Sequence, residues 1–431
     1  MLTKEENELL TRVGPGTVMG DFLRQYWQPI LLSTELAEPD CAPLRVRLMG
    51  EDLIAFRTTS GKVGLVGNHC PHRGASLFFG RNEEEGLRCV YHGWKFDVEG
   101  NCVDMPNEPP ESNFKHKIRH QAYVCQEKAG LIWAYLGPQN PAPPIPELEW
   151  TLVPDSQRYV SKRWQESNWA QSIEGGIDNS HASFLHSKLK VNPEASATAY
   201  MFNDRHPRFE AVDTDYGTMI VARREAGEDK YYWRITQFYM PFYTMIPGFG
   251  SDGLNDGHAW VPIDDENTMT WSITWQTERP LTEEELHTRK TYPGSGIHVG
   301  INGGFKPATS APGGAWRTLP ELANNFHLDR DLQKTEQFCG IINFGMQDSG
   351  VQVSMGPIYD RTKEHLATSD TGVIRVRRRW VNGATALREH GTTPPAVNTP
   401  EIYRARAVPI VLPKDQSWAD ATVELRKSKV K

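Results

Sequence analysis

The first apolar residues of the chain recur at the spacing of two short helices. Thr3 and Glu6 form a capping-box pair ahead of an apolar run at residues 9–13, a pattern typical of a helix start. The glycines and proline at 14–16 end this helix. A second short helix is predicted next, and its apolar side consists of Phe22, Leu23, Tyr26 and Trp27.

After Pro43 the hydrophobic period changes from helical to alternating. Apolar residues alternate with arginines over 44–48, and further β-like runs occupy 53–58, 63–67 and 131–136, which predicts a small, mostly antiparallel β domain. Prolines then crowd residues 138–146, and such a segment is typical of a stiff linker. We therefore divide the chain into N-terminal helices at 1–37 that pack with the larger domain, a β domain at 38–146 and a larger domain at 147–431.

The larger domain mixes both periods, so its predicted class is α+β. A helical segment is expected around 166–187, strands at 217–223, 231–239 and 269–276, and a long loop at 293–314. Apolar residues from Val373 to Leu387 recur at helical spacing, and Gly391 supplies the stop.

Composition and charge exclude several classes of protein. Hydrophobic content of 38% without an apolar run of about 18 residues argues against a membrane span. The acidic N-terminus does not suit a secretory signal, so we expect a cytoplasmic protein. A net charge of −7 disfavours nucleic acid, and we interpret the one dense basic run, residues 375–379, as a solvated helix face.

Two Cys/His pairs in the β domain point to a metal centre. Cys70-Pro71-His72 is followed, after sixteen intervening residues, by Cys89-Val90-Tyr91-His92. Zinc accepts two thiolates and two imidazoles, and so does a [2Fe–2S] cluster of the Rieske type. We favour the Rieske cluster because each loop supplies one thiolate and one imidazole, and structural zinc stays open as the alternative. The other cysteines are expected to be free thiols: Cys41, Cys102, Cys125 and Cys339.

A second group of ligand types lies in the larger domain. His181 and His186 stand five positions apart, which on a regular helix would turn their side chains about 140° from each other, so the helix must bulge or end here. Two histidines and one carboxylate are the ligands of non-heme Fe(II) oxygenases. Asp178 precedes His181 by three positions and could hydrogen-bond its imidazole from outside the metal's own ligands. The third ligand must then come from elsewhere in the chain.

These motifs resemble the large (alpha) subunit of Rieske non-heme iron aromatic-ring-hydroxylating oxygenases. The match extends from residue 1 to about 390 and includes Gln347-Asp348 and the segment 354–366, which look like the phthalate and chlorobenzoate dioxygenase group. The resemblance implies a helix-grip catalytic domain, in which an antiparallel sheet carries helices. It also implies that Cys70, His72, Cys89 and His92 hold one [2Fe–2S] cluster and that His181, His186 and Asp348 hold one Fe(II). Asp360 competes with Asp348 for the last position.

The resemblance further implies how such an enzyme works. The chain would be the terminal oxygenase that uses O2 to cis-dihydroxylate an aromatic carboxylate of the phthalate, chlorobenzoate or phenoxybenzoate type, in aromatic catabolism. Asp178 would carry electrons from His92 of a neighbouring subunit, which implies a homo-oligomeric ring, a trimer or a dimer of trimers. No strand followed by a G-x-G-x-x-G motif is found in the sequence, so electrons from NADH would arrive through a separate flavin and iron–sulfur reductase.

Two other functions remain open on the sequence. A monooxygenase or O-demethylase of an aromatic acid uses the same two centres. An electron-transfer Rieske protein would need only residues 40–145. A substrate carboxylate needs a cation in its pocket, and we expect Arg208 or Arg234 to supply it, because both lie in the region that lines the pocket of the family.

Overall fold

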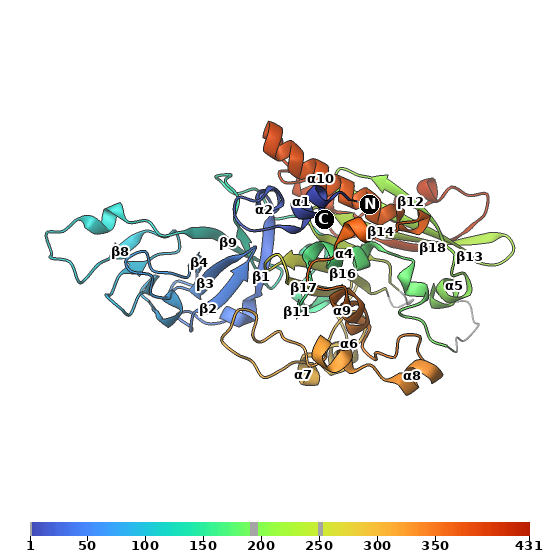
Figure 1. Cartoon of the computed structure of the whole chain (residues 1–431), viewed down its shortest axis with the longest axis horizontal. Helices are drawn as coiled ribbons and strands as arrows, with labels where there is room; N and C mark the ends of the chain where they lie inside the picture. The colour runs from blue at the N-terminus through green and yellow to red at the C-terminus, as the bar shows by residue number, and fades with distance from the viewer. Residues whose placement is uncertain (1, 190–196, 249–252) are drawn as a thin grey trace.

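The computed structural model describes residues 2–189, 197–248 and 253–431. It has two parts, and Figure 1 shows the smaller, β-rich part at one end of an elongated molecule, with both chain termini at the larger part. The described residues include no helix with the length and apolar character needed to cross a bilayer.

The smaller part contains two antiparallel sheets. A six-stranded sheet has the order β1-β10-β9-β4-β3-β2, and a four-stranded sheet has the order β5-β6-β7-β8. Their strands are β1 (Trp27–Leu32), β2 (Leu44–Leu48), β3 (Glu51–Arg57), β4 (Val63–Gly67), β5 (Arg81–Glu83), β6 (Gly86–Arg88), β7 (Lys95–Phe96), β8 (Cys102–Asp104), β9 (Ala122–Lys128) and β10 (Leu131–Tyr135).

The larger part is built on one antiparallel sheet with the order β11-β17-β16-β15-β14-β13-β12, and β18 pairs with β14. The strands are β11 (Arg158–Gln165), β12 (Arg208–Asp213), β13 (Gly217–Glu225), β14 (Lys230–Tyr239), β15 (Tyr243–Ile246), β16 (Asn255–Pro262), β17 (Thr268–Trp275) and β18 (Val408–Pro413). The fold class is therefore α+β, as the mixture of periods predicted.

Helices α4 and α10 pack together against this sheet. Trp380 of α10 contacts both Trp169 of α4 and Phe238 of β14. The α-helices are α1 (Lys4–Thr11), α2 (Val18–Arg24), α3 (Glu149–Leu152), α4 (Trp169–Ile177), α5 (Ala197–Asn203), α6 (Glu283–Lys290), α7 (Ile301–Gly304), α8 (Arg330–Thr335), α9 (Phe344–Ser354), α10 (Thr371–His390) and α11 (Trp418–Ala421). The capping box of Thr3 and Glu6 and the stop at Gly391, which is left-handed, are both present as predicted.

The N-terminal segment differs from the expectation in one respect. Helices α1 and α2 pack against α10 of the larger part, whereas Trp27 does not continue a helix but begins β1, which pairs with β10. The sheet of the smaller part therefore starts before residue 38. The cause is a long-range pairing, since β1 meets a partner strand that the chain forms only at residues 131–135.

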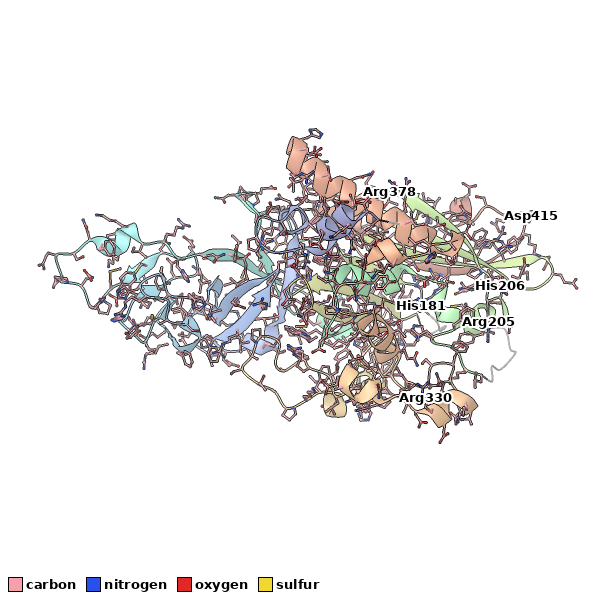
Figure 2. All side chains as sticks on the ribbon, in the orientation of Figure 1. His181, Arg205, His206, Arg330, Arg378 and Asp415 are labelled. Atoms are coloured by element: carbon pink, nitrogen blue, oxygen red, sulfur yellow. The ribbon has the colours of Figure 1, made fainter. Side chains whose placement is uncertain are left out.

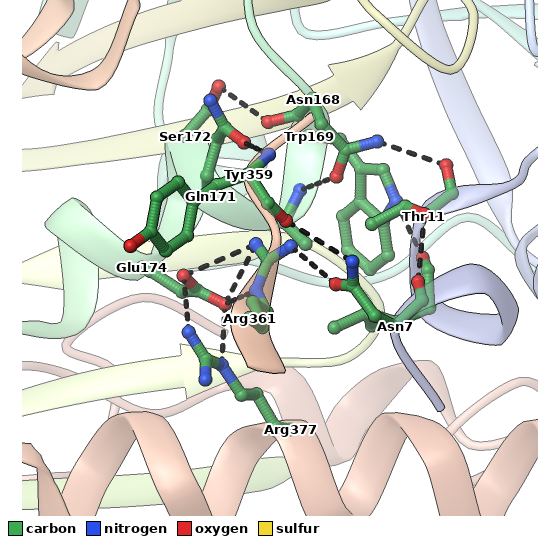
Figure 3. Close-up of polar contacts among 12 residues, drawn as sticks. Asn7, Thr11, Asn168, Trp169, Gln171, Ser172, Glu174, Tyr359, Arg361 and Arg377 are labelled. Carbon is green, nitrogen blue, oxygen red and sulfur yellow. Dashed lines mark hydrogen bonds and ion pairs between the residues drawn. The ribbon is translucent and has the colours of Figure 1, made fainter. Parts of the chain in front are cut away.

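The basic run on α10 is only in part the solvated face that we expected. Arg378 lies on the outer side of the helix (Figure 2) and is exposed, but Arg377 is buried and pairs with Glu174 and Glu364. Figure 3 shows that Glu174 of α4 also meets Arg361, which in turn bonds Asn7 of α1. This network ties α1 and α10 to α4.

Candidate metal centres

The two Cys/His loops of the smaller part have matching backbone geometry. In the first, Cys70 N–H donates to Ala75 O (2.8 Å) and Gly74 N–H to Cys70 O (2.9 Å). In the second, Cys89 N–H donates to Trp94 O (2.8 Å) and Gly93 N–H to Cys89 O (2.9 Å). Each loop closes through a glycine, with φ of +79° and +82°, a conformation that costs glycine little.

These loops bring the four expected cluster ligands together. Cys70 and Cys89 are buried, the rings of His72 and His92 lie 4.5 Å apart, and Trp94 stacks on His72 at 4.4 Å. Burial raises the pKa of the Cys70 thiol to about 11, and the neighbouring Cys89 adds to the rise. Buried thiols side by side are therefore poor anions unless a cation binds them.

One orphaned atom tests whether this set fits a cluster. The Nδ1 atom of His72 is buried and has no hydrogen-bond partner among the described residues. Such an atom costs about 1–3 kcal/mol when it stays unsatisfied. Ligation to a metal would remove that cost, so the residues fit a His2Cys2 cluster.

The second group lies in the larger part, just after α4. The helix ends at Ile177 and the 3-10 turn η5 (His181–Ser183) follows, so the two histidines do not share a regular helix, as their spacing predicted. Asp178 shapes this turn, since its carboxylate accepts from the N–H groups of Ser180 (2.6 Å) and His181 (3.1 Å). Figure 2 places His181 within the larger part.

Asp348 of α9 completes a three-residue set. The Nε2 atoms of His181 and His186 lie 3.1 Å apart, and Asp348 Oδ1 lies 3.5 and 3.4 Å from them. Burial alone would raise the pKa of Asp348, but His186, His181 and the positive charge of Arg163 lower it to about 2. Two imidazole nitrogens and an ionised carboxylate that converge on one point are the donor set of a facial-triad Fe(II) site.

Glycines let α4 approach its neighbours closely enough to build this group. A Cβ atom on Gly175 would lie 2.1 Å from the side-chain nitrogen of Gln352 in α9, and one on Gly176 would lie 3.0 Å from the indole of Trp260 in β16. The pair of glycines therefore sets how near α4 lies to α9, which carries Asp348, and to the sheet.

Each of the two histidines also contacts a side-chain oxygen through its Nδ1 atom, on the side of the ring away from Asp348. His181 Nδ1 lies 3.2 Å from Asp178 Oδ2, as expected, and His186 Nδ1 lies 2.6 Å from Gln347 Oε1. The sequence reasoning missed the second contact, although Gln347 stands next to Asp348. It also missed Phe344, whose ring stacks on His186 at 3.7 Å, because neither contact leaves a periodic signal.

The other residues that the sequence analysis singled out for the site lie in different places in the larger part. Arg234 is buried on β14, and its Nε donates to Asn179 Oδ1 at 2.9 Å. Arg208 is exposed at the start of β12, the last strand of the sheet order. Asp360 is exposed, caps η7 (Arg361–Lys363) and accepts a hydrogen bond from Thr362; it is not part of the converging donor set.

Comparison with known proteins agrees with this arrangement. Residues 26–121 match the family model of the Rieske [2Fe-2S] domain, and residues 134–431 match the model described as LigXa C-terminal domain like. The chain is 40% identical to the 3-chlorobenzoate-3,4-dioxygenase oxygenase subunit of Comamonas testosteroni, over 98% of each chain.

Two further relatives match over most of the chain. The phthalate 4,5-dioxygenase oxygenase subunit of Pseudomonas putida is 36% identical, over 97% of this chain and 94% of that protein. The 5,5'-dehydrodivanillate O-demethylase oxygenase subunit of Sphingobium sp. (strain NBRC 103272 / SYK-6) is 32% identical, over 95% and 87%. The protein therefore belongs to the Rieske non-heme iron oxygenases, as an oxygenase subunit with a LigXa-like catalytic domain.

Proposed function

We propose that this chain is the terminal oxygenase that cis-dihydroxylates an aromatic carboxylate of the chlorobenzoate, phthalate or phenoxybenzoate type. The observation that carries the proposal is the converging set of His181, His186 and Asp348 in the same chain as the two Cys/His loops. The relatives named for chlorobenzoate and phthalate support the substrate class.

In this proposal the residues of each centre have separate tasks. Cys70, His72, Cys89 and His92 hold one [2Fe–2S] cluster, and His181, His186 and Asp348 hold one Fe(II). When bound, the two groups would supply electron storage and O2 activation, respectively. His181 donates its Nδ1 proton to Asp178, which fixes the ring with Nε2 toward His186 and Asp348, the other residues that would hold the iron.

Arg234 is the residue that we assign to the substrate carboxylate. It is 3% exposed, and it lies on the strand that also carries Thr236, a hydrogen-bond partner of Asn179. Its positive charge opposes the rise in the pKa of His181. A guanidinium suits a carboxylate because it can donate two parallel hydrogen bonds. The exposed position of Arg208 on the outermost strand makes it the weaker choice.

Electrons would reach the iron between subunits of a ring, a trimer or a dimer of trimers, through Asp178. Both ends of such a path are partly accessible, since the side chain of Asp178 is 26% exposed and the half-buried His92 has the exposed Val90 and Tyr91 beside it. The Asp178→Asn variant is expected to keep both metal centres and lose electron transfer. Rapid reoxidation of its reduced cluster in a single turnover would remove Asp178 from the path.

Substrate and reaction are tested by product analysis. We expect a cis-diol from at least one member of a panel of chlorobenzoates, phthalate and phenoxybenzoates, with NADH and a flavin and iron–sulfur reductase. An O-demethylase is the second candidate, because the dehydrodivanillate relative matches 95% of the chain; formaldehyde from a methoxylated aromatic acid, without a diol, would favour it. An electron carrier would contain about two irons per chain, whereas the oxygenase contains about three.

A further inference from the structure

Gln347 is buried between the donor set of His181, His186 and Asp348 and the loop that precedes α9. Its side chain is nearly inaccessible, with 6% of the residue exposed, and it makes two short hydrogen bonds. Its Oε1 lies 2.6 Å from His186 Nδ1, and its Nε2 donates to the carbonyl oxygen of Ile341, also at 2.6 Å.

The bond to Ile341 determines which way the amide of Gln347 faces. A backbone carbonyl can only accept a hydrogen bond, so the NH2 group must point to Ile341 and the oxygen must point to His186. With the amide turned over, two oxygens would face each other at 2.6 Å. The Nδ1 atom of His186 must therefore donate, which leaves its Nε2 with a free lone pair directed at Asp348 and His181.

The two histidines thus have partners of different charge. His181 donates to the carboxylate of Asp178, whereas His186 donates to a neutral amide. We propose that Gln347 is the positioning residue of His186: it fixes the tautomer and ring orientation that present Nε2 to the metal, without adding a second negative charge behind the histidine pair. This inference rests on the mononuclear iron site of the proposed function.

A pair of substitutions isolates the contact with His186. Gln347→Met and Gln347→Glu both remove the donor to Ile341, but only Glu keeps an oxygen at Nδ1. We expect the Met variant to bind Fe(II), or Co(II) as its probe, roughly 10- to 100-fold more weakly than the wild type. The Glu variant, which keeps an oxygen at Nδ1 although its second oxygen faces the carbonyl of Ile341, should bind the metal more tightly than the Met variant. Equal losses in both variants, or wild-type affinity in the Met variant, would overturn the proposal.

A measurement on the wild-type chain covers the case in which a variant does not fold. With Co(II) in the mononuclear site and the cluster oxidised, the proton NMR spectrum should contain two hyperfine-shifted, exchangeable imidazole N–H signals, one for each histidine. A missing signal from His186 would contradict the proposed tautomer. His186→Ala tests the underlying site separately: if that variant keeps full metal affinity, the iron site itself is wrong, whatever Gln347 does.

Discussion

At the scale of single residues, the third iron ligand is the assignment that sequence alone left open. Asp348 and Asp360 are both acidic and only twelve positions apart, and spacing cannot distinguish them. Their surroundings differ: Asp348 lies 3.4 Å from His186 Nε2, whereas Asp360 bonds Thr362 at the start of a surface turn. A ligand must be held close to its partners, and only the folded chain reveals which carboxylate meets that condition.

We therefore predict that Asp348→Ala lowers the iron content from about three to about two per chain, because the cluster keeps its irons while the mononuclear site loses a ligand. Asp360→Ala is the matched control and should keep about three. Total iron and acid-labile sulfide measured on the same samples give both numbers. Full iron in the Asp348 variant together with loss in the Asp360 variant would reverse the assignment.

The two arginines allow an equally direct comparison. Arg234→Met should raise the apparent KM for an aromatic acid roughly 10- to 100-fold, since a hydrogen bond to a charged group contributes about 1.5–3 kcal/mol. Arg208→Met, at the exposed edge strand, should leave the KM unchanged. Steady-state kinetics with a substrate that the wild type oxidises would check both, and equal effects in the two variants would argue against a pocket role for Arg234.

At the scale of elements, sequence periodicity predicted seven of the eighteen strands that the described residues form, and the long helix α10. Alternation located β13, β14 and β17, and the 3.6-residue period located α10, since both patterns are local. Periodicity failed at Trp27, whose strand depends on a distant partner, and at Arg377, whose burial depends on Glu174 and Glu364. The metal motifs were readable because their ligands are chemically distinctive, while Gln347 acts only through a neighbour that folding provides.

The close contact of α4 with α9 gives a prediction at this scale. Gly175→Ala places a methyl group 2.1 Å from the side-chain nitrogen of Gln352. Because Gln352 is buried and its Oε1 accepts a hydrogen bond from Gln165, the amide cannot move aside freely, and overpacking of this kind costs about 1–3 kcal/mol. We expect a lower thermal midpoint and weaker iron retention, because α9 carries Asp348 and α4 leads directly into the turn that carries His181. Gly14→Ala, where a Cβ meets nothing within 4 Å, is the control that should show neither effect.

At the scale of the whole molecule, one buried ionic network connects α1, α10 and the segment around Arg361 to α4. Glu174 pairs with Arg361 and Arg377, and Arg361 also bonds Asn7 (Figure 3). Burial by itself would raise the pKa of Glu174, but the two guanidinium groups hold it below its usual value of 4.5. The carboxylate therefore stays ionised in the folded protein at neutral pH.

Because the folded-state pKa of Glu174 is lowered, its stabilisation is present above about pH 4.5 and is lost as the pH falls through the folded value. Glu174→Gln should destabilise the protein by about 3–5 kcal/mol at pH 7, since it leaves two buried cations short of a partner. The difference in thermal midpoint between variant and wild type should shrink below pH 4.5. A difference in thermal midpoint that stays constant from pH 7 to below pH 4.5 would show that the charge of Glu174 is not the cause of the destabilisation.

The ring is the largest unit that these residues imply, and two inactive chains can test it together. Cys70→Ser removes the cluster and Asp348→Ala removes the iron, so each homo-oligomer should be inactive. If electrons pass between subunits, a mixed oligomer contains interfaces where an intact cluster faces an intact iron site, about a quarter of all interfaces at equal mixing in a head-to-tail ring. Activity should return in mixed oligomers purified through two different tags. Transfer within a single chain predicts none, because no chain in the mixture carries both centres.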